Sequence, residues 1–362
     1  MGKVRVMLSL QDREWDSFFI KDIFDEVERG KRLKKGDHIV GDRPYVSSTA
    51  LNNGVDGFIG NTTKIRVFSD CLSLANSGSV GSCFYEPFEF IASDHVTHLR
   101  KSGMSYRQYL FMASMLSRLS EKYNFNREIN DERISREKIF LPIDSKGNPD
   151  FDFMESYVKE IEEVKREEYK EFCKAKLVEL GSYKKEIDEI EPKWDAIPIP
   201  ELFKVFQPGK GKGLNHLKIV NEGISYIGAT NRNNGVLCYV EDNKDSHKMI
   251  QKGNCIGFIK NGDGSAGYAI YKQEDFISTS DVIYGYADWL NLYTGLYFVG
   301  AQDMIKPKYS HGYKRNQEHL NGDKVMLPIK KNGKPDFEYM EQVVKNSMIK
   351  KYTQYLKYAE KY

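Results

Sequence analysis

The sequence predicts an α/β (α+β) protein in which one domain plan occurs twice and each copy is followed by a long helix. First, LPIDSKGNPDFDFME at Leu141 returns as LPIKKNGKPDFEYME at Leu327, an offset of 327 − 141 = 186 residues. Second, short aromatic and β-branched runs broken by Gly, Asn and Asp indicate strands joined by tight turns. Third, apolar residues recur at steps of three and four after each copy, as in amphipathic helices.

The duplication extends through each copy. At the offset of 186, five residues of the first copy have identical partners in the second: Gly78, Gly81, Tyr85, Phe90 and Ile91 match Gly264, Gly267, Tyr271, Phe276 and Ile277. Upstream, Asn52–Val55 matches Asn233–Val236 at an offset of 181, and Trp15-Asp16 matches Trp194-Asp195 at 179. Matches in the same order indicate duplication. We therefore predict a first domain over 1–150, a long helix over 151–192, a second domain over 193–336 and a second helix over 337–362.

The helices are expected at equivalent places. Inside the domains, apolar spacing predicts helices over Tyr106–Tyr123 and Ala287–Met304. The long helix is expected from Asp152 to about Ile190, with a bend at Gly181, and at about 1.5 Å per residue its 39 residues span about 58 Å. Asp150 or Asp152 and Asp336 are expected to cap the two long helices. The apolar stripes predict an antiparallel pair that separates the domains; the alternative is that each helix packs on its own domain.

Composition excludes several classes of protein. The 362 residues include 54 Lys and Arg against 52 Asp and Glu, so the chain is no polycation. No apolar run approaches the roughly 20 residues of a membrane span, and the first residues do not resemble a signal peptide, so we expect a soluble cytoplasmic protein. Five scattered cysteines without a C-x-x-C motif predict neither zinc nor disulfides.

The charge is unevenly distributed. Residues 151–192 hold 8 basic and 13 acidic side chains, 8 − 13 = −5, so the remainder carries +2 − (−5) = +7. The domains are therefore the basic part, although an ordinary solvated surface would also explain this excess.

The sequence contains no recognisable catalytic motif. Gly262-x-Gly264-x-x-Gly267 fits the dinucleotide fingerprint, but it lies between two strand-like runs and its duplicate lacks the first glycine, which predicts a turn. The Pro149-Asp150 and Pro335-Asp336 pairs lack the acidic-x-Lys of a nuclease, and His95-x-x-His98 lacks a third metal ligand. We expect no catalytic residue, no metal and no cofactor in this chain.

At this point the sequence resembles the specificity (S) subunits of type I restriction–modification systems and their BcgI-like relatives. The resemblance covers essentially the whole chain. It rests on Trp15, Ile23-Phe24 and Gly30-Lys31-Arg32, on YVSSTALNNGV and YIGATNRNNGV, on the Gly78 and Gly264 turns, and on LPI…PDF…ME occurring twice.

The resemblance implies a non-catalytic subunit with two target recognition domains, each reading one half of a split asymmetric DNA sequence. The helices would dock adenine methyltransferase subunits, two in number, and fix the spacing. S-adenosylmethionine would be bound by the methyltransferase, and a restriction subunit would be a further partner. The alternatives are a non-catalytic protein scaffold, or a nuclease or methyltransferase whose motifs are not recognised.

Lys and Arg contact phosphates, while Asn, Arg and similar side chains read base edges. The residues predicted to contact double-stranded DNA are Lys31, Arg32, Lys34, Lys35, Arg43, Asn52, Asn53, Asn126 and Arg127 in the first domain, and Lys210, Lys212, Arg232, Asn233, Lys260, Tyr313, Lys314 and Arg315 in the second. The Asn-Asn-Gly segments have an alternative explanation as turn residues with positive φ. The residues predicted to bind the partner are Phe172, Leu177, Met348, Tyr352 and Tyr355.

Overall fold

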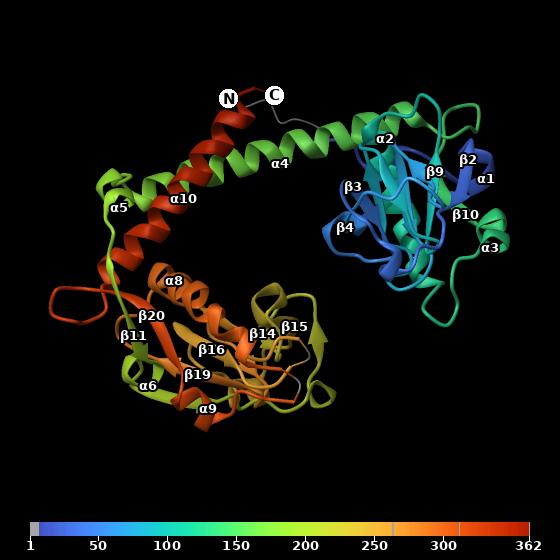
Figure 1. Cartoon of the computed structure of the whole chain (residues 1–362). Helices are drawn as coiled ribbons and strands as arrows, with labels where there is room; N and C mark the ends of the chain where they lie inside the picture. The colour runs from blue at the N-terminus through green and yellow to red at the C-terminus, as the bar shows by residue number, and fades with distance from the viewer. Residues whose placement is uncertain (1–6, 263, 311, 362) are drawn as a thin grey trace. The chain divides into compact units, whose positions relative to one another are not determined.

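A computed structural model describes residues 7–262, 264–310 and 312–361. The chain divides into two compact units, unit 1 (Met1–Tyr169) and unit 2 (Lys170–Tyr362). Figure 1 shows that both combine helices with twisted sheets. None of the described helices is long and apolar enough to cross a lipid bilayer.

Unit 1 is built from three sheets. Its strands are β1 (Trp15–Phe19), β2 (Glu26–Arg29), β3 (Val40–Val46), β4 (Val55–Ile59), β5 (Val67–Phe68), β6 (Cys71–Ala75), β7 (Cys83–Glu86), β8 (Phe90–Ala92), β9 (Val96–Arg100) and β10 (Lys138–Pro142). Its helices are α1 (Ile20–Ile23), α2 (Tyr106–Ser117), α3 (Asp131–Arg136) and the first part of α4 (Phe151–Leu180). The strand orders are β2-β9-β6-β7, β4-β3-β8-β5 and the pair β1-β10.

Unit 2 repeats this architecture. Its strands are β11 (Lys193–Pro198), β12 (Val205–Pro208), β13 (Ile219–Val220), β14 (Ile224–Ile227), β15 (Val236–Val240), β16 (Cys255–Ile259), β17 (Ala269–Lys272), β18 (Ile277–Ser278), β19 (Val282–Tyr286) and β20 (Lys324–Ile329). Its helices are α5 (Lys185–Glu189), α6 (Ile199–Leu202), α7 (Lys244–His247), α8 (Leu292–Gln302), α9 (Gln317–Asn321) and α10 (Phe337–Ala359). The orders are β12-β19-β16-β17, β13-β15-β14-β18 and the pair β11-β20.

The topology confirms the duplication. The order β2-β9-β6-β7 has its counterpart in β12-β19-β16-β17, and among the described residues each unit contains one parallel pairing, β3 with β8 and β14 with β18. The two ends of each sequence repeat pair with each other, because Trp15 lies opposite Pro142 and Trp194 lies opposite Pro328. The repeated WD and LP segments are therefore the two strands that close each unit.

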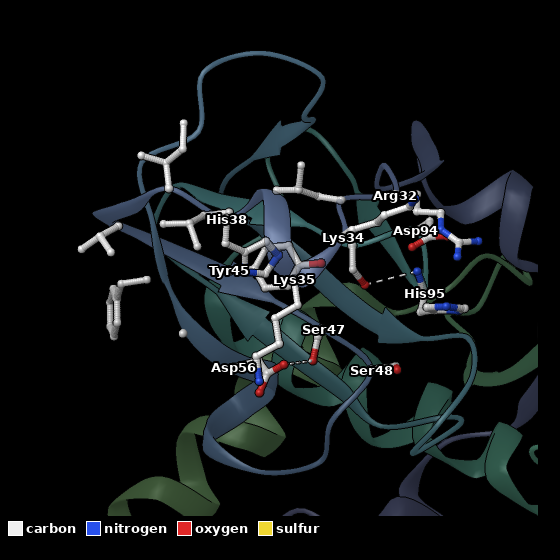
Figure 2. Close-up of a pocket in the computed structure, with 17 residues that line it drawn as sticks. Arg32, Lys34, Lys35, His38, Tyr45, Ser47, Ser48, Asp56, Asp94 and His95 are labelled. Atoms are coloured by element: carbon white, nitrogen blue, oxygen red, sulfur yellow. Dashed lines mark hydrogen bonds between the residues drawn. The ribbon is translucent and has the colours of Figure 1, made fainter.

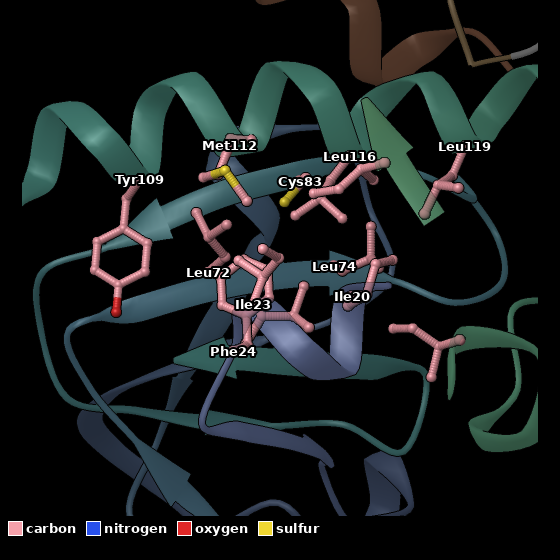
Figure 3. Packing of buried hydrophobic residues seen from close by; sticks show 14 of the residues in the cluster. Ile20, Ile23, Phe24, Leu72, Leu74, Cys83, Tyr109, Met112, Leu116 and Leu119 are labelled. Atoms are coloured by element: carbon pink, nitrogen blue, oxygen red, sulfur yellow. The ribbon is translucent and has the colours of Figure 1, made fainter. Parts of the chain in front are cut away.

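The core of each unit lies between its main helix and its central sheet. In Figure 3, Met112 and Leu116 of α2 point toward Leu72 and Leu74 of β6, and all four are fully buried. Burying a side chain of this size contributes roughly 1.5–3 kcal/mol. In unit 2, α8 packs on the equivalent sheet, and the Phe298 ring lies 5.4 Å from that of Phe203. The helices predicted over Tyr106–Tyr123 and Ala287–Met304 are present as the shorter α2 and α8, and they supply one wall of each core.

The long helix is shorter than predicted. Helix α4 ends at Leu180, and Gly181 has a φ of 74°, which terminates the helix instead of bending it. The short α5 follows, so the expectation of one helix to about Ile190 is wrong. The caps are confirmed: Asp150 Oδ1 accepts from Phe153 N at 2.9 Å, and Asp336 Oδ1 accepts from Tyr339 N at 3.0 Å.

Within unit 2, the end of α4 packs antiparallel to α10. The rings of Phe172 and Tyr352 lie 5.9 Å apart. One to two turns further along α4, Glu179 accepts a hydrogen bond from the Tyr293 hydroxyl. The ring of Tyr293 in turn lies 4.7 Å from Nζ of Lys345 on α10. Since positions increase along α4 as they decrease along α10, the two helices run in opposite directions. Helix α10 also packs on α8 of the same unit, so the pairing and its alternative both hold in part.

Candidate nucleic-acid interface

A basic loop leaves β2 of unit 1 through a glycine. Gly30 N donates to Val96 O at 2.9 Å, and Lys31 N donates to Ala92 O at 3.1 Å. A Cβ atom on Gly30 would lie 2.2 Å from the carbonyl oxygen of Ser93, so only glycine lets the chain pass this closely. The exposed Lys31, Arg32, Lys34 and Lys35 follow, and none of the four forms an ion pair among the described residues.

Unit 2 also has a basic loop that follows a closely packed glycine. Gly209 N donates to Val282 O at 3.0 Å, and a Cβ atom there would lie 1.9 Å from the carbonyl oxygen of Thr279. The exposed Lys210 and Lys212 follow, and the Tyr226 hydroxyl donates to Lys212 O at 2.8 Å. The two loops are therefore anchored by the same backbone hydrogen bond, from the glycine to the first residue of β9 in unit 1 and of β19 in unit 2.

The basic loop of unit 1 borders a groove of about 570 Å³, which we call the loop groove. Its charged and polar lining is Arg32, Lys34, Lys35, His38, Tyr45, Ser47, Ser48, Asp56, Ser93, Asp94 and His95. Figure 2 shows Lys35 above Ser47 and Asp56, with Tyr45 of β3 beside it. The Ser47 hydroxyl donates to Asp56 Oδ2 at 3.2 Å, and His95 N donates to Ser93 Oγ at 3.2 Å. The groove thus combines cations for phosphates with hydroxyl, imidazole and carboxylate groups that can read base edges.

Burial keeps the tyrosine of this groove in its neutral form. Tyr45 is buried, which raises the pKa of its phenol above the ordinary value, and the charges of Asp94 and Asp56 raise it further. The His38 ring meets the Tyr45 ring edge-on at 4.7 Å. Tyr45 and His38 thus form an aromatic floor of the groove, while its rim carries both signs of charge.

The Asn-Asn-Gly segments are turns with left-handed backbone. The φ angles of Asn52 and Asn53 are 50° and 52°, and those of Asn233 and Asn234 are 47° and 48°. The conformational explanation is thus confirmed, because asparagine and glycine tolerate positive φ. In unit 2 the amide of Asn233 also donates to Val236 O at 3.2 Å. The exposed side chains of Asn52 and Asn53 stay candidates for DNA contact.

Other candidates of unit 1 lie outside the loop groove. Arg43 forms an ion pair with Glu89, with Nε 2.9 Å from Oε1. Asn126 and Arg127 belong to a tight turn in which Arg127 N donates to Asn124 O at 2.9 Å. The structure therefore brings together Arg32, Lys34 and Lys35 and leaves these residues outside the groove lining.

In unit 2 three segments are tied together by hydrogen bonds. The turn with Arg232 and Asn233 is joined to the Gly262–Gly267 turn through Asn231 Oδ1, which accepts from Ser265 Oγ at 2.9 Å. Lys260 Nζ donates to Ser280 O at 2.9 Å, and Lys260 O accepts from Arg315 N at 3.0 Å. Tyr313 and Lys314 are exposed on the third segment, beside the Lys260 backbone.

The prediction that Arg315 contacts DNA is wrong. Its side chain is fully buried, and its Nε donates to Asp323 Oδ2 at 2.9 Å. Its Nη1 donates to Gln302 Oε1 at 2.6 Å and to Gly267 O at 3.2 Å. Because a buried charge needs partners, this arginine belongs to the core and holds the loop in place.

The acidic and hydroxyl residues of the loop groove were not predicted. Asp56, Asp94 and Ser47 stand beside residues that match between the repeats, yet their counterparts at the offsets of 181 and 186 are Leu237, Ser280 and Gly228. A difference between the two repeats close to positions that are identical in both is the sequence signal that could have identified them.

The residues predicted to bind a partner lie on the paired helices. Phe172 and Tyr352 contact each other, whereas Leu177, Met348 and Tyr355 are half-buried. Val178 is 84% exposed, a larger exposed fraction than that of any of them. Their role toward a partner stays a prediction.

Titratable clusters do not suggest a metal centre. No group of three or more His, Cys, Asp or Glu side chains is placed to hold a metal ion within residues 7–262, 264–310 and 312–361.

The glycine-rich segment around Gly264 connects the antiparallel strands β16 and β17, so it is the turn that the sequence predicted.

Comparison with known proteins identifies the family. The model of the type I restriction modification DNA specificity domain matches residues 12–171 and 191–357. The specificity subunit S.BcgI of a type II restriction enzyme from Heyndrickxia coagulans is 26% identical over 338 residues, which are 91% of this chain and 93% of that protein.

Two solved structures resemble the chain over most of its length, with low sequence identity and low TM-scores. The S subunit of a type I system from M. genitalium is 15% identical with a TM-score of 0.49, covering 98% of this chain and 94% of that chain. The HsdS subunit from Thermoanaerobacter tengcongensis is 12% identical with a TM-score of 0.30, covering 96% and 91%. Since the family model matches most of the sequence in two successive segments, this chain belongs to the type I restriction–modification DNA specificity family and is a specificity subunit with two recognition domains.

Proposed function

We propose that the chain reads a bipartite, asymmetric DNA sequence, one half with each unit, and itself performs no chemistry. The observation that carries this proposal is one scaffold that has different side chains at equivalent positions of its two units. Asp56 on β4 corresponds to Leu237 on β15, and Ser47 corresponds to Gly228. A carboxylate accepts a hydrogen bond from an exocyclic amino group, whereas leucine contacts a thymine methyl group. Equivalent positions in the two units would therefore favour different bases.

The basic loops would contact phosphates. Lys31, Arg32, Lys34 and Lys35 in unit 1, and Lys210 and Lys212 in unit 2, are exposed cations on glycine-anchored loops. Each phosphate neutralised releases counterions, so binding would weaken steeply with salt.

Adenine methyltransferase subunits, two in number, are the proposed partners, with a restriction subunit as a further one. Val178 and the half-buried Leu177, Met348 and Tyr355 supply apolar surface on α4 and α10 for this contact. S-adenosylmethionine would be bound by the methyltransferase, and the assembly would act on DNA in the cytoplasm. Helices α4 and α10 would also set the distance between the half-sites.

Domain replacement tests this function. Residues 15–150 are exchanged for the corresponding domain of another specificity subunit, and the methylated motif is determined by sequencing modified bases in cells that carry the methyltransferase. One half-site should change and the other should stay. A change in both halves would refute separate reading, and the unexchanged chain with its methyltransferase is the control.

A further inference from the structure

A second groove of unit 1 lies where the outer face of the β1–β10 pair meets the end of α2. Strand β10 alternates, with Ile139 and Leu141 buried in the core and Lys138 and Phe140 facing outward. Phe140 is 64% exposed, although it lies in the middle of a strand. Together with Trp15 and the helix residues Met115 and Leu119, it lines a cavity of about 680 Å³.

Unit 2 has a groove at the same positions. Strand β20 buries Val325 and Leu327 and turns Lys324 and Met326 outward. Lys324, Met326 and Trp194 are the repeat counterparts of Lys138, Phe140 and Trp15, and they line a cavity of about 710 Å³. Met304 completes its rim and is 82% exposed. We call these two cavities the strand–helix grooves.

Trp15, Met115 and Leu119 also pack against the core of unit 1. Phe140, Met304 and Met326 lie outside the cores and expose most or half of their side chains. Single exposed apolar residues are normal on a protein surface, whereas large ones that converge in a concavity mark a contact site. In unit 1 the groove already accepts an aliphatic residue, because Leu10 lines it and Leu10 O accepts from Trp15 Nε1 at 2.8 Å. An apolar side chain beside the tryptophan is thus compatible with the geometry.

A lysine without an acidic partner borders each groove. Arg118 and Lys122 of the unit 1 groove form ion pairs with Glu121 and Glu137. No ion pair of Lys138 or Lys324 with a carboxylate is recorded in the part of the chain that the structure describes. The complementary surface would therefore present apolar side chains next to a carboxylate.

We propose that each strand–helix groove docks one copy of the same protein subunit, the methyltransferase of the system, through apolar side chains flanked by an acidic residue. Both grooves keep the Trp, Lys and apolar positions, whereas the loops of the two units have diverged, so the occupant presents the same surface to both. DNA fits this requirement less well, because Arg118 and Lys122 of the unit 1 groove are already paired with carboxylates and most of the remaining lining is apolar. The inference rests on the proposed function and adds an interface separate from α4 and α10.

The test uses the full chain and its methyltransferase subunit, with stoichiometry measured by native mass spectrometry and affinity by titration. Phe140→Glu should weaken binding of one methyltransferase copy about tenfold, a loss of about 1.4 kcal/mol, and Met326→Glu should do the same for the other copy. In the double variant both copies should bind about tenfold more weakly, so each site should be only about one-tenth occupied at the concentration that half-saturates the unmodified chain. Lys324→Glu should resemble Met326→Glu, whereas Lys324→Arg should bind normally.

Controls separate this inference from folding and from the proposed function. Phe88→Glu and Ile219→Glu place the same charge on exposed apolar residues outside the grooves and should leave both copies bound. Circular dichroism and a DNA mobility shift at low salt should be unchanged in every variant. Two copies bound with unchanged affinity to the double variant would overturn the groove assignment while leaving DNA reading intact. Failure of the unmodified chain to bind DNA would count against the proposed function itself.

Discussion

At the scale of single residues, the buried Arg315 shows how far the two units have diverged inside the same fold. Its repeat counterpart, at 315 − 186 = 129, is Ile129, and both side chains are fully buried. The two residues make equivalent backbone hydrogen bonds, because Arg315 N donates to Lys260 O and Ile129 N donates to Asn76 O, both at 3.0 Å. The segment at Arg315 in unit 2 is thus held by an ion pair, whereas the equivalent segment at Ile129 in unit 1 is held by apolar contacts.

Removing Asp323 should be more harmful than removing Arg315. Asp323→Ala leaves a buried guanidinium without its carboxylate, which costs about 3–5 kcal/mol. Arg315→Met should cost less, because Asp323 keeps Lys308 Nζ at 2.8 Å and the Tyr309 hydroxyl at 2.8 Å. Urea denaturation followed by circular dichroism measures both, and equal losses would contradict the pairing argument.

Glu86 should make unit 1 less stable as the pH rises. It is fully buried, and burial raises the pKa of its carboxyl from 4.5 to about 7, against the lowering effect of the Ser73 hydroxyl, which donates to Oε1 at 2.8 Å. A raised pKa means that the folded state binds the proton more tightly than the unfolded state. The stabilisation is therefore complete below pH 4.5 and is lost as the pH rises through 7, about 3 kcal/mol in all.

Glu86→Gln tests this dependence, because glutamine imitates the neutral acid. The variant and the native chain should be similarly stable at pH 4, and the variant should be more stable at pH 8. Free energies of unfolding at several pH values between 4 and 8 provide the measurement. A native profile parallel to that of the variant would show that Glu86 is not the titrating group.

At the scale of elements, the two glycines at the loop bases decide where the basic loops begin. Gly30→Ala and Gly209→Ala would each drive a Cβ atom into a backbone carbonyl, at 2.2 Å and 1.9 Å. We expect a loss of about 1–3 kcal/mol for each, as for other overpacked sites, together with weaker DNA binding. Gly36→Ala is the matched control, because no atom lies within 4 Å of its Cβ position. Thermal unfolding and a DNA titration should separate the variants from this control.

Secondary structure was predictable where the signal is local. Asp336 caps α10 as expected, and the Asn-Asn-Gly turns have the positive φ that their residues suggest. The end of α4 was missed because the apolar periodicity continues past Gly181, while the backbone of that glycine stops the helix. Here a single left-handed residue overrides a longer pattern.

At the scale of the whole molecule, helix length should set the gap between half-sites. Inserting four residues between Lys174 and Val178 adds about one turn and roughly 6 Å of rise, against about 3.4 Å per base pair. The preferred gap should grow by about one or two base pairs, and the bases read should stay the same. Each added pair also rotates the second half-site by about 34°, which the interface must absorb. Full activity with an unchanged gap, seen in the methylated motif, would show that the helices are not the ruler.

The duplication, the order of the elements and the capped helices were determined by the sequence alone, because repeats, periodicity and turn residues are properties of neighbouring positions. The family resemblance rested on the same local motifs and was confirmed by the match to residues 12–171 and 191–357.

Only the tertiary structure decided which side chains are exposed and which of them meet. Lys314 and Arg315 are adjacent cations, yet one faces solvent and the other lies in the core beside Asp323. Trp15 lies opposite Pro142, 127 positions along the chain by 142 − 15, and together with Lys138 and Phe140 it lines a groove that no local pattern revealed. Burial depends on contacts between residues distant in the chain, and these form only when the strands pair and the helices cover them.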